Sequence, residues 1–212
     1  MLFPQIWMPT TSCWLINNLL KSRLRSEQMG MSNHESDRPL RGLIWDELAR
    51  ACDDRNHQWR TPVLASSGSD GFPQARTVVL RQTDAERSEL RIFTDRRSAK
   101  IAELSKRPHA SLVFWSAALS WQLRIRCAVT IDIDSAEVAR IWDTVKESAA
   151  ASDYLAPAAP GTPLAPFEQT STTDHHLAII VASVVEMDWL ELSRRGHRRA
   201  RLTADTLTWL TP

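Results

Sequence analysis

Cationic and hydroxyl side chains gather in one stretch of the sequence, residues 76–100. Its first part reads Arg-Thr-Val-Val-Leu-Arg (76–81), and after a polar turn it continues as Ile-Phe-Thr-Asp-Arg-Arg-Ser-Ala-Lys (92–100). We expect two strands and then a helix whose first turn carries two arginines, a serine and Lys100. Free backbone N–H groups at a helix N-terminus, together with cationic side chains, suit a phosphate monoester. The stretch therefore predicts an anion site, although a solvated basic turn is the simpler interpretation of this segment alone.

A second cluster of charge lies near the C-terminus, where residues 194–201 hold five arginines and one histidine. Such a run is typical of a solvated hairpin end or of a nucleic-acid patch. The formal net charge of +1 and the lack of a basic amphipathic helix or a zinc motif argue against nucleic acid. The sequence also lacks the motifs of serine hydrolases, P-loop NTPases and dinucleotide-binding folds.

The elements that must position these side chains follow from hydrophobic periodicity and turn residues. Apolar residues spaced three and four apart predict a helix over 40–54, opened by Pro39. Alternating apolar and polar residues predict a half-buried strand over 120–132. Other strands are predicted at 62–66, 74–81, 89–94, 110–117, 176–192, 199–202 and 207–210, with helices after Thr94 or Asp95 and after an Asp134–Glu137 capping box. Strands joined mainly by tight turns favour a mainly β fold, an antiparallel barrel with flanking helices.

The composition, with 43% hydrophobic and 24% charged residues among 212, is that of a soluble globular protein. We expect a poorly ordered tail over residues 1–38, then one domain over 39–212 that includes a long Pro/Ala-rich loop at 149–173. The three cysteines have neither metal-ligand nor disulfide spacing, so we expect no metal and a reducing cytoplasm. The hydrophobic run 13–20 is too short to cross a membrane.

Four motifs, taken in order, resemble those of the pyridoxamine 5'-phosphate oxidase family of FMN-binding split barrels. They are residues 76–81, Phe-Thr-Asp-Arg-Arg-Ser-Ala-Lys (93–100), the glutamine in Trp-Gln-Leu-Arg-Ile-Arg (121–126), and a tryptophan upstream of Arg-Gly-His-Arg-Arg (195–199). The resemblance covers residues 40–212. It implies a split barrel that binds FMN as a homodimer.

The resemblance also implies which residues hold the FMN phosphate. Arg76 and Lys100 stand at the two positions that bind the phosphate in the family. The family has an arginine before this lysine, where the present chain has Ala99, and Arg97 could supply the missing charge.

The remaining cofactor contacts implied by the family involve the flavin ring and a second subunit. Gln122 matches a glutamine that bonds to the ring, and Trp189 and Arg199 match residues that complete the site from across the dimer. The cofactor-binding set implied in this way is Arg76, Thr77, Val78, Val79, Phe93, Thr94, Arg97, Ser98, Lys100, Gln122, Trp189 and Arg199.

The substrate contacts implied by the family are Arg81, Arg195 and His197. Arg76 and Arg81 bracket four residues, so in one continuous strand they would point to opposite faces, which leaves Arg81 for the substrate. The family has an arginine in its substrate-phosphate site, but residues 146–154 contain none. The vitamer substrate therefore stays open.

We expect an FMN-dependent oxidase of vitamin B6 metabolism that converts pyridoxamine or pyridoxine 5'-phosphate to pyridoxal 5'-phosphate with O2. The flavin supplies the hydride chemistry, so no catalytic side chain is assigned. The alternatives are a split-barrel flavin reductase or oxidoreductase with another substrate, and a non-catalytic protein that binds a ligand or nucleic acid. For the enzyme we expect a cytoplasmic homodimer with neither nucleic acid nor membrane as a partner.

Overall fold

The computed structural model describes residues 33–163 and 174–212 as an antiparallel sheet with flanking helices. The expected mainly β fold is thereby confirmed. The strands are β1 (Val63–Ser67), β2 (Pro73–Thr77), β3 (Leu80–Asp84), β4 (Glu89–Asp95), β5 (His109–Ser116), β6 (Trp121–Asp132), β7 (Leu177–Glu191), β8 (Arg198–Leu202) and β9 (Leu207–Leu210). The helices are α2 (Asn33–Asp53), η1 (Gln58–Arg60), α3 (Ala99–Lys106), α4 (Ala136–Val145), η2 (Ala149–Ala151) and α5 (Ser152–Leu155).

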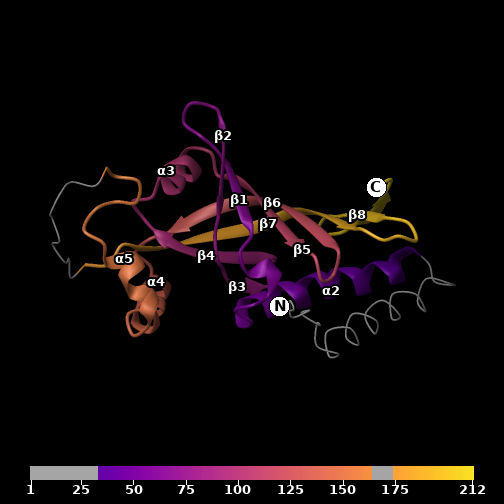
Figure 1. Ribbon diagram of the computed structural model, residues 1–212, viewed down its shortest axis with the longest axis horizontal. Helices are drawn as coiled ribbons and strands as arrows, with labels where there is room; N and C mark the ends of the chain where they lie inside the picture. The colour runs from indigo at the N-terminus through magenta and orange to yellow at the C-terminus, as the bar shows by residue number, and fades with distance from the viewer. Residues whose placement is uncertain (1–32, 164–173) are drawn as a thin grey trace, which may run out of the picture.

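Strand β7 organises the sheet because it pairs along both of its edges (Figure 1). One edge pairs with β6 along the whole length of that strand. The other edge pairs first with β4, over residues 177–183, and then with β8, over residues 187–191. The main path of the sheet is β2-β1-β5-β6-β7-β4-β3, and the β8–β9 hairpin leaves it at the end of β7 that lies away from α4 and α5 (Figure 1).

Alternation along β6 sets the inner and outer faces of the sheet. Leu123, Ile125 and Cys127 are buried, whereas Arg124 and Arg126 between them are exposed. The predicted half-buried strand is thus confirmed, and its apolar face contributes to the main core.

Helix α2 covers the core with one apolar stripe, formed by Leu40, Ile44, Leu48 and Ala51, which are all buried. It packs on β3 and on η1. The indole of Trp59 in η1 is fully buried, and its ring lies 5.6 Å from that of Phe114 and 6.3 Å from that of Trp121. Large aromatic side chains therefore fill the space between η1 and the sheet.

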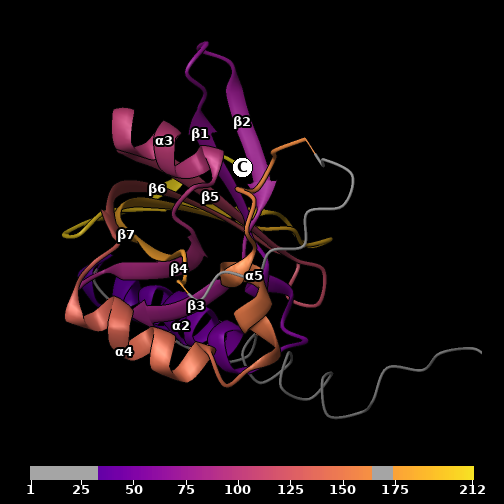
Figure 2. The same cartoon turned by 90° about the vertical axis from the view of Figure 1, so that its left-hand side faces the viewer.

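Helices α4 and α5 lie next to each other on one side of the sheet (Figure 2), and a smaller core lies between them and β7. Val138 and Ile141 of α4 and Tyr154 of α5 pack against Leu177 and Ile179 of β7. Ile180 and Ala182 of the same strand belong to the main core, so this half of β7 is covered on both faces. Such double coverage explains its continuous apolar sequence.

The predicted strand over 74–81 is wrong, because the structure divides it into β2 and β3. The backbone N–H of Val78 donates to the carbonyl of Pro62 at 3.0 Å, and β3 begins two residues later. β2 and β3 are the two ends of the sheet path, so this short connection crosses from one end to the other. The inference that Arg76 and Arg81 share one strand fails for the same reason.

Two helical segments extend beyond their predicted bounds. α2 begins at Asn33 and contains Pro39, because apolar spacing marks only the packed part of a helix. The expected tail over 1–38 therefore differs from the structure at residues 33–38, which lie in this helix, and residues 1–32 lie outside the described residues. η2 and α5 occupy the start of the expected loop 149–173, while 164–173 lie outside the described residues.

Among the helices that are described, none combines the length and the apolarity needed to cross a membrane.

The helix caps also differ from the prediction. The N-cap of α3 is Ser98 rather than Thr94 or Asp95, because the Asp95 carboxylate accepts the backbone N–H two residues on, at 2.7 Å, and closes a turn before the helix. The N-cap of α4 is Ser135 rather than Asp134, and its hydroxyl accepts two backbone N–H groups of the first turn.

The two described cysteines should differ in reactivity. Burial raises the pKa of the Cys127 thiol to about 12, and burial also raises the pKa of half-buried Cys52. Because the thiolate is the reactive form, iodoacetamide at about pH 8 should leave Cys127 unmodified in the folded protein and modify Cys52 slowly. Timed alkylation with peptide mass spectrometry measures both rates, with denatured protein as the control. Rapid labelling of native Cys127 would contradict its place in the core.

Candidate functional site

Helix α3 lies beside the β1–β2 hairpin (Figure 2), and polar side chains from β2, the end of β4 and the start of α3 come together there. We call Arg76, Thr94, Ser98 and Lys100 the cradle. Lys100 Nζ donates to Thr94 Oγ1 at 2.9 Å, and the hydroxyls of Thr94 and Ser98 are 3.4 Å apart. The structure therefore brings together four of the residues that the sequence assigned to a phosphate.

The local chain explains why these groups face one point. Thr94 is a buried residue near the end of β4, and Ser98 is the buried N-cap of α3. The Ser98 hydroxyl makes no capping hydrogen bond with the helix, and the first N–H groups of an α-helix have no partner inside it. Donors from backbone and side chains are thus available next to Lys100.

Arg76 is oriented by two residues that sequence reasoning missed, Ser66 and Glu103. Its guanidinium donates to the Ser66 hydroxyl and, at 2.8 Å, to Glu103 Oε2. The Ser66 hydroxyl in turn donates to the same carboxylate oxygen at 2.6 Å. The spacing of Glu103 from Lys100 could have indicated its role, because residues three apart lie on the same side of a helix.

The charge balance of the cradle suits an anion. Burial lowers the pKa of the Lys100 ammonium, the nearby Arg76 lowers it further, and Asp95 and Glu103 oppose the shift. The cradle thus contains two cations, Arg76 and Lys100, and only one carboxylate, that of Glu103, forms a hydrogen bond with it. A phosphate would restore the favourable environment that burial removes from Lys100, so these residues fit the phosphate end of FMN.

The other residues assigned near the cradle are placed differently. Thr77 is exposed at the end of β2, Val78 is buried in the main core and Val79 is half-buried in the connection to β3. Phe93 precedes Thr94 in β4, so its side chain lies on the opposite face of the strand, against the smaller core. None of these four side chains takes part in the hydrogen bonds of the cradle.

Arg97 is not brought into the cradle. Its guanidinium pairs with Asp95 through two hydrogen bonds, Nε to Oδ1 at 3.1 Å and Nη2 to Oδ2 at 2.7 Å. It also donates to backbone carbonyls that follow α5. Burial works to raise the pKa of Asp95, but the hydrogen bonds from Arg97 outweigh burial and hold it below its ordinary value.

Arg81 lies at a β-bulge. Pairing passes from Leu80↔Ile92 to Gln82↔Arg91, which leaves Arg81 without a partner in the ladder, and a bulge redirects a side chain. Arg81 bonds to the hydroxyl of Tyr154, whose pKa is raised by burial and partly lowered again by this arginine. The Nε of Arg81 is buried and has no hydrogen-bond partner among the described residues. Tyr154 was not among the assigned site residues, although it ends the stretch 146–154 in which the resemblance places the substrate-phosphate site.

The assigned residues of β6, β7 and β8 form a separate group at the other end of β7. Arg199 donates to the carboxylate of Asp188 at 2.9 and 2.8 Å, and Arg124 also bonds to this carboxylate. Hydrogen bonds from Arg199, which outweigh burial, lower the pKa of Asp188. Gln122 lies two residues before Arg124, on the same face of β6. The hydrogen bonds of Arg124 and Arg199 described here go to Asp188 and not to the cradle.

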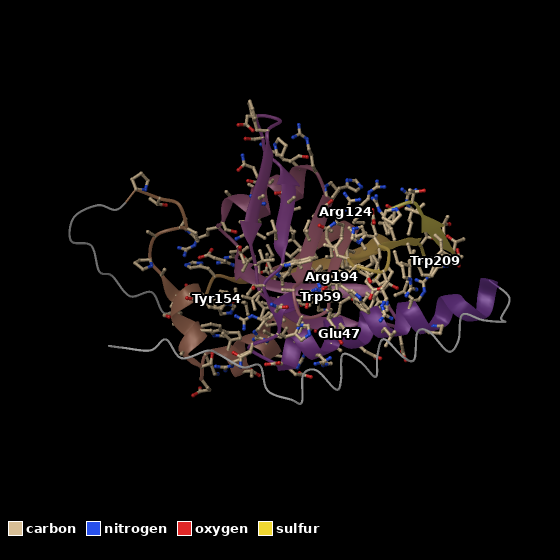
Figure 3. All side chains as sticks on the ribbon, turned by 45° about the vertical axis from the view of Figure 1, so that its right-hand side comes forward. Glu47, Trp59, Arg124, Tyr154, Arg194 and Trp209 are labelled. Carbon is tan, nitrogen blue, oxygen red and sulfur yellow. The ribbon has the colours of Figure 1, made fainter. Side chains whose placement is uncertain are left out.

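Trp189 faces the core rather than this group. It is fully buried, its ring lies 5.2 Å from that of Trp121, and the guanidinium of Arg198 sits 5.5 Å from its centroid. Arg195 and His197 are exposed in the turn before β8, and His197 Nδ1 accepts the backbone N–H of Ser193. In Figure 3, Tyr154 lies on one side of the molecule and Trp209 of the β8–β9 hairpin on the other.

A surface cavity of about 450 Å³ adjoins the cradle. The link is Ser66, which lines the cavity and accepts a hydrogen bond from Arg76 of the cradle. The cavity is lined by Ala65, Ser66, Ser67, His109, Ala110, Ser111, Arg126, Cys127 and Val185.

Comparison with known proteins identifies the region that holds the cradle. Residues 43–132 match a family model described as pyridoxamine 5'-phosphate oxidase, FMN-binding domain. A pyridoxine/pyridoxamine 5'-phosphate oxidase of Anaeromyxobacter dehalogenans is 36% identical over 85 residues, which are 40% of this chain and 42% of the relative. Another, from Thermosynechococcus vestitus, is 48% identical over 62 residues, 29% of this chain and 28% of the relative. The matched stretches thus span less than half of these curated relatives.

Solved structures share the fold. A pyridoxamine 5'-phosphate oxidase-related, FMN-binding protein of Nostoc punctiforme has a TM-score of 0.66 at 24% identity, covering 82% of this chain and 97% of its own. PhzG of Burkholderia lata, solved with tetrahydrophenazine-1-carboxylic acid, has a TM-score of 0.65 at 19% identity, covering 81% and 91%. Residues 43–132, which contain β1 to β6 and the whole cradle, therefore match the FMN-binding domain of pyridoxamine 5'-phosphate oxidases, and the chain shares the fold of the solved split-barrel proteins.

Proposed function

We propose that the protein is an FMN-dependent oxidoreductase and that the cradle binds the FMN phosphate. The observation that carries this proposal is the convergence of Arg76, Thr94, Ser98 and Lys100, held in place by Glu103, inside the matched domain. Arg76 and Lys100 would neutralise the phosphate, and the two hydroxyls would donate to its oxygens. When bound, FMN supplies hydride transfer from a substrate carbon and reoxidation by O2.

For the substrate we propose a small phosphorylated molecule, with pyridoxamine or pyridoxine 5'-phosphate as the first candidate. The names of the curated relatives support this choice. Arg81 at its bulge is the cationic group available for a substrate anion, and Arg195 and His197 would approach from a second copy. The protein side chains would bind and orient the substrate and would transfer no proton.

A second candidate is an FMN-dependent reductase or oxidoreductase with a different substrate. Residues 146–154 contain no arginine, and Tyr154, the last of them, bonds to Arg81. This arrangement provides fewer cations for a substrate phosphate than the resemblance implies.

The free thiols of Cys52 and Cys127 support a reducing compartment, so we place either enzyme in the cytoplasm.

One experiment separates these functions. The visible spectrum of purified protein, with and without added FMN, reports flavin binding, and incubation with each vitamer in air reports pyridoxal 5'-phosphate and peroxide. Flavin binding with turnover of either vitamer supports the oxidase. Flavin binding without turnover favours the second candidate, and the absence of flavin binding contradicts both.

We propose a homodimer. The resemblance assigns Arg199 and the cradle to the same FMN site, but within one chain they lie in separate groups, so a second copy would have to supply Arg199. The outer face also exposes large apolar side chains, Val63, Trp115 and Val185, which a second copy would cover. In a twofold dimer the β8 end of one chain would complete the cradle of its partner.

Replacing Lys100 by alanine tests the cradle directly. Loss of a charge-assisted hydrogen bond to phosphate should cost about 1.5–3 kcal/mol of FMN affinity. Fluorescence titration measures the dissociation constant. Lys106→Ala, in the exposed last turn of the same helix, is the matched control and should bind FMN as the wild type does. An unchanged dissociation constant for Lys100→Ala would remove this residue from the site.

The lowered pKa of Lys100 predicts a pH dependence of FMN binding. As pH rises, the ammonium is lost at a lower pH than for an ordinary lysine, so FMN affinity should begin to fall at a pH below the ordinary pKa of lysine, about 10.4. Lys100→Arg keeps its charge at that pH and should bind FMN without that decline. Equal pH profiles for the two proteins would show that Lys100 does not titrate at the phosphate.

Mixing two defective variants tests the shared site. Lys100→Ala and Arg199→Ala should each weaken FMN binding, one from each side of the dimer interface. In a randomly reassembled equal mixture, about a quarter of all sites combine two intact halves and should recover wild-type affinity. Titration of the mixture measures this fraction. A mixture that behaves as the sum of its two components would argue against a site shared between subunits.

A further inference from the structure

Arg97 anchors the short segment that follows α4. We call residues 152–158 the strap. Its C-terminal part is held by the guanidinium of Arg97, which donates to the carbonyls of Ala156 at 2.7 Å, Pro157 at 3.0 Å and Ala158 at 3.3 Å. Because the guanidinium is planar, its hydrogen bonds to three consecutive carbonyls fix the orientation of the strap relative to Arg97.

The anchor is itself immobilised. The Asp95 carboxylate, which is buried, receives two hydrogen bonds from the Arg97 guanidinium and one from the Arg97 backbone N–H. Turning Arg97 toward the cradle would leave this buried carboxylate without its cation, which is strongly unfavourable. The contacts of Arg97 thus oppose the role of phosphate ligand that its place in the sequence suggested.

The strap is docked at a second point as well. The backbone N–H of His176 donates to the Tyr154 carbonyl at 2.8 Å, and the backbone N–H of Arg96 donates to the His176 carbonyl at 2.7 Å. The Tyr154 side chain is buried in the smaller core, and its hydroxyl meets Arg81. The strap therefore connects the turn that carries the cradle to the arginine at the bulge.

We propose that Arg97 is a positioning residue, which docks the strap and thereby places Tyr154 against Arg81, and that it is not a ligand of the FMN phosphate. The proposal deepens the proposed function by limiting the cationic phosphate ligands of this chain to Arg76 and Lys100. Docking of the strap can be measured on flavin-free protein, so it can fail or hold independently of FMN binding.

Tyr154 provides a specific signal because it is the one tyrosine in the sequence. Burial raises the pKa of its hydroxyl. Absorbance at the tyrosinate band during an alkaline titration should therefore rise at a lower pH in Arg97→Ala than in wild type. Arg97→Lys should resemble Arg97→Ala, because an ammonium lacks the planar fork. Arg96→Ala is the control, since its side chain is exposed and its backbone N–H is retained.

Hydrogen exchange of the flavin-free variants tests the same docking near neutral pH. In Arg97→Ala the His176 amide should exchange about tenfold faster, equivalent to about 1.4 kcal/mol of local opening, with Arg96→Ala unchanged. FMN affinity of Arg97→Ala should stay within about threefold of wild type, against a loss of at least about tenfold in Lys100→Ala. Unchanged exchange and tyrosine titration in Arg97→Ala would overturn the proposal. So would a loss of FMN affinity equal to that of Lys100→Ala.

Discussion

The pairing of β7 along both of its edges is the constraint on which the rest of the structure depends. Its first half is covered by the main core on one face and by α4 and α5 on the other, so its position is fixed from both sides. Pairing with β4 ends at Asp95↔Leu177, and the chain turns into α3 at that point. The location of the cradle is therefore a consequence of the sheet rather than of a flexible loop.

Thr94 and Asp95, the last two residues of β4, bind different side chains of the turn that follows. Successive side chains of a strand point to opposite faces, so Thr94 joins Lys100 and Ser98, whereas Asp95 faces the strap. Asp95 then binds Arg97 and keeps this cation away from the cradle. This arrangement explains how a short run can contain several basic residues when only one of them, Lys100, faces the anion site.

Sequence reasoning predicted the sheet well because its signals are local. The alternation along β6 and the apolar run of β7 follow directly from burial on one face or on both. The break between β2 and β3 had no such signal, since Val78 and Val79 suit a strand and only the crossing between the ends of the sheet path separates them. The roles of Glu103 and Asp95 depend on tertiary contacts, and Trp189 was assigned by resemblance although this chain buries it.

The central claim is that the cradle recognises a phosphate, and the affinity of the purified wild-type protein for FMN compared with riboflavin tests it most directly. The two flavins share the ring and differ in the phosphate that Arg76 and Lys100 would bind. Two charge-assisted contacts of about 1.5–3 kcal/mol each predict that FMN binds at least about 100-fold more tightly. Equal affinity for FMN and riboflavin would contradict the account.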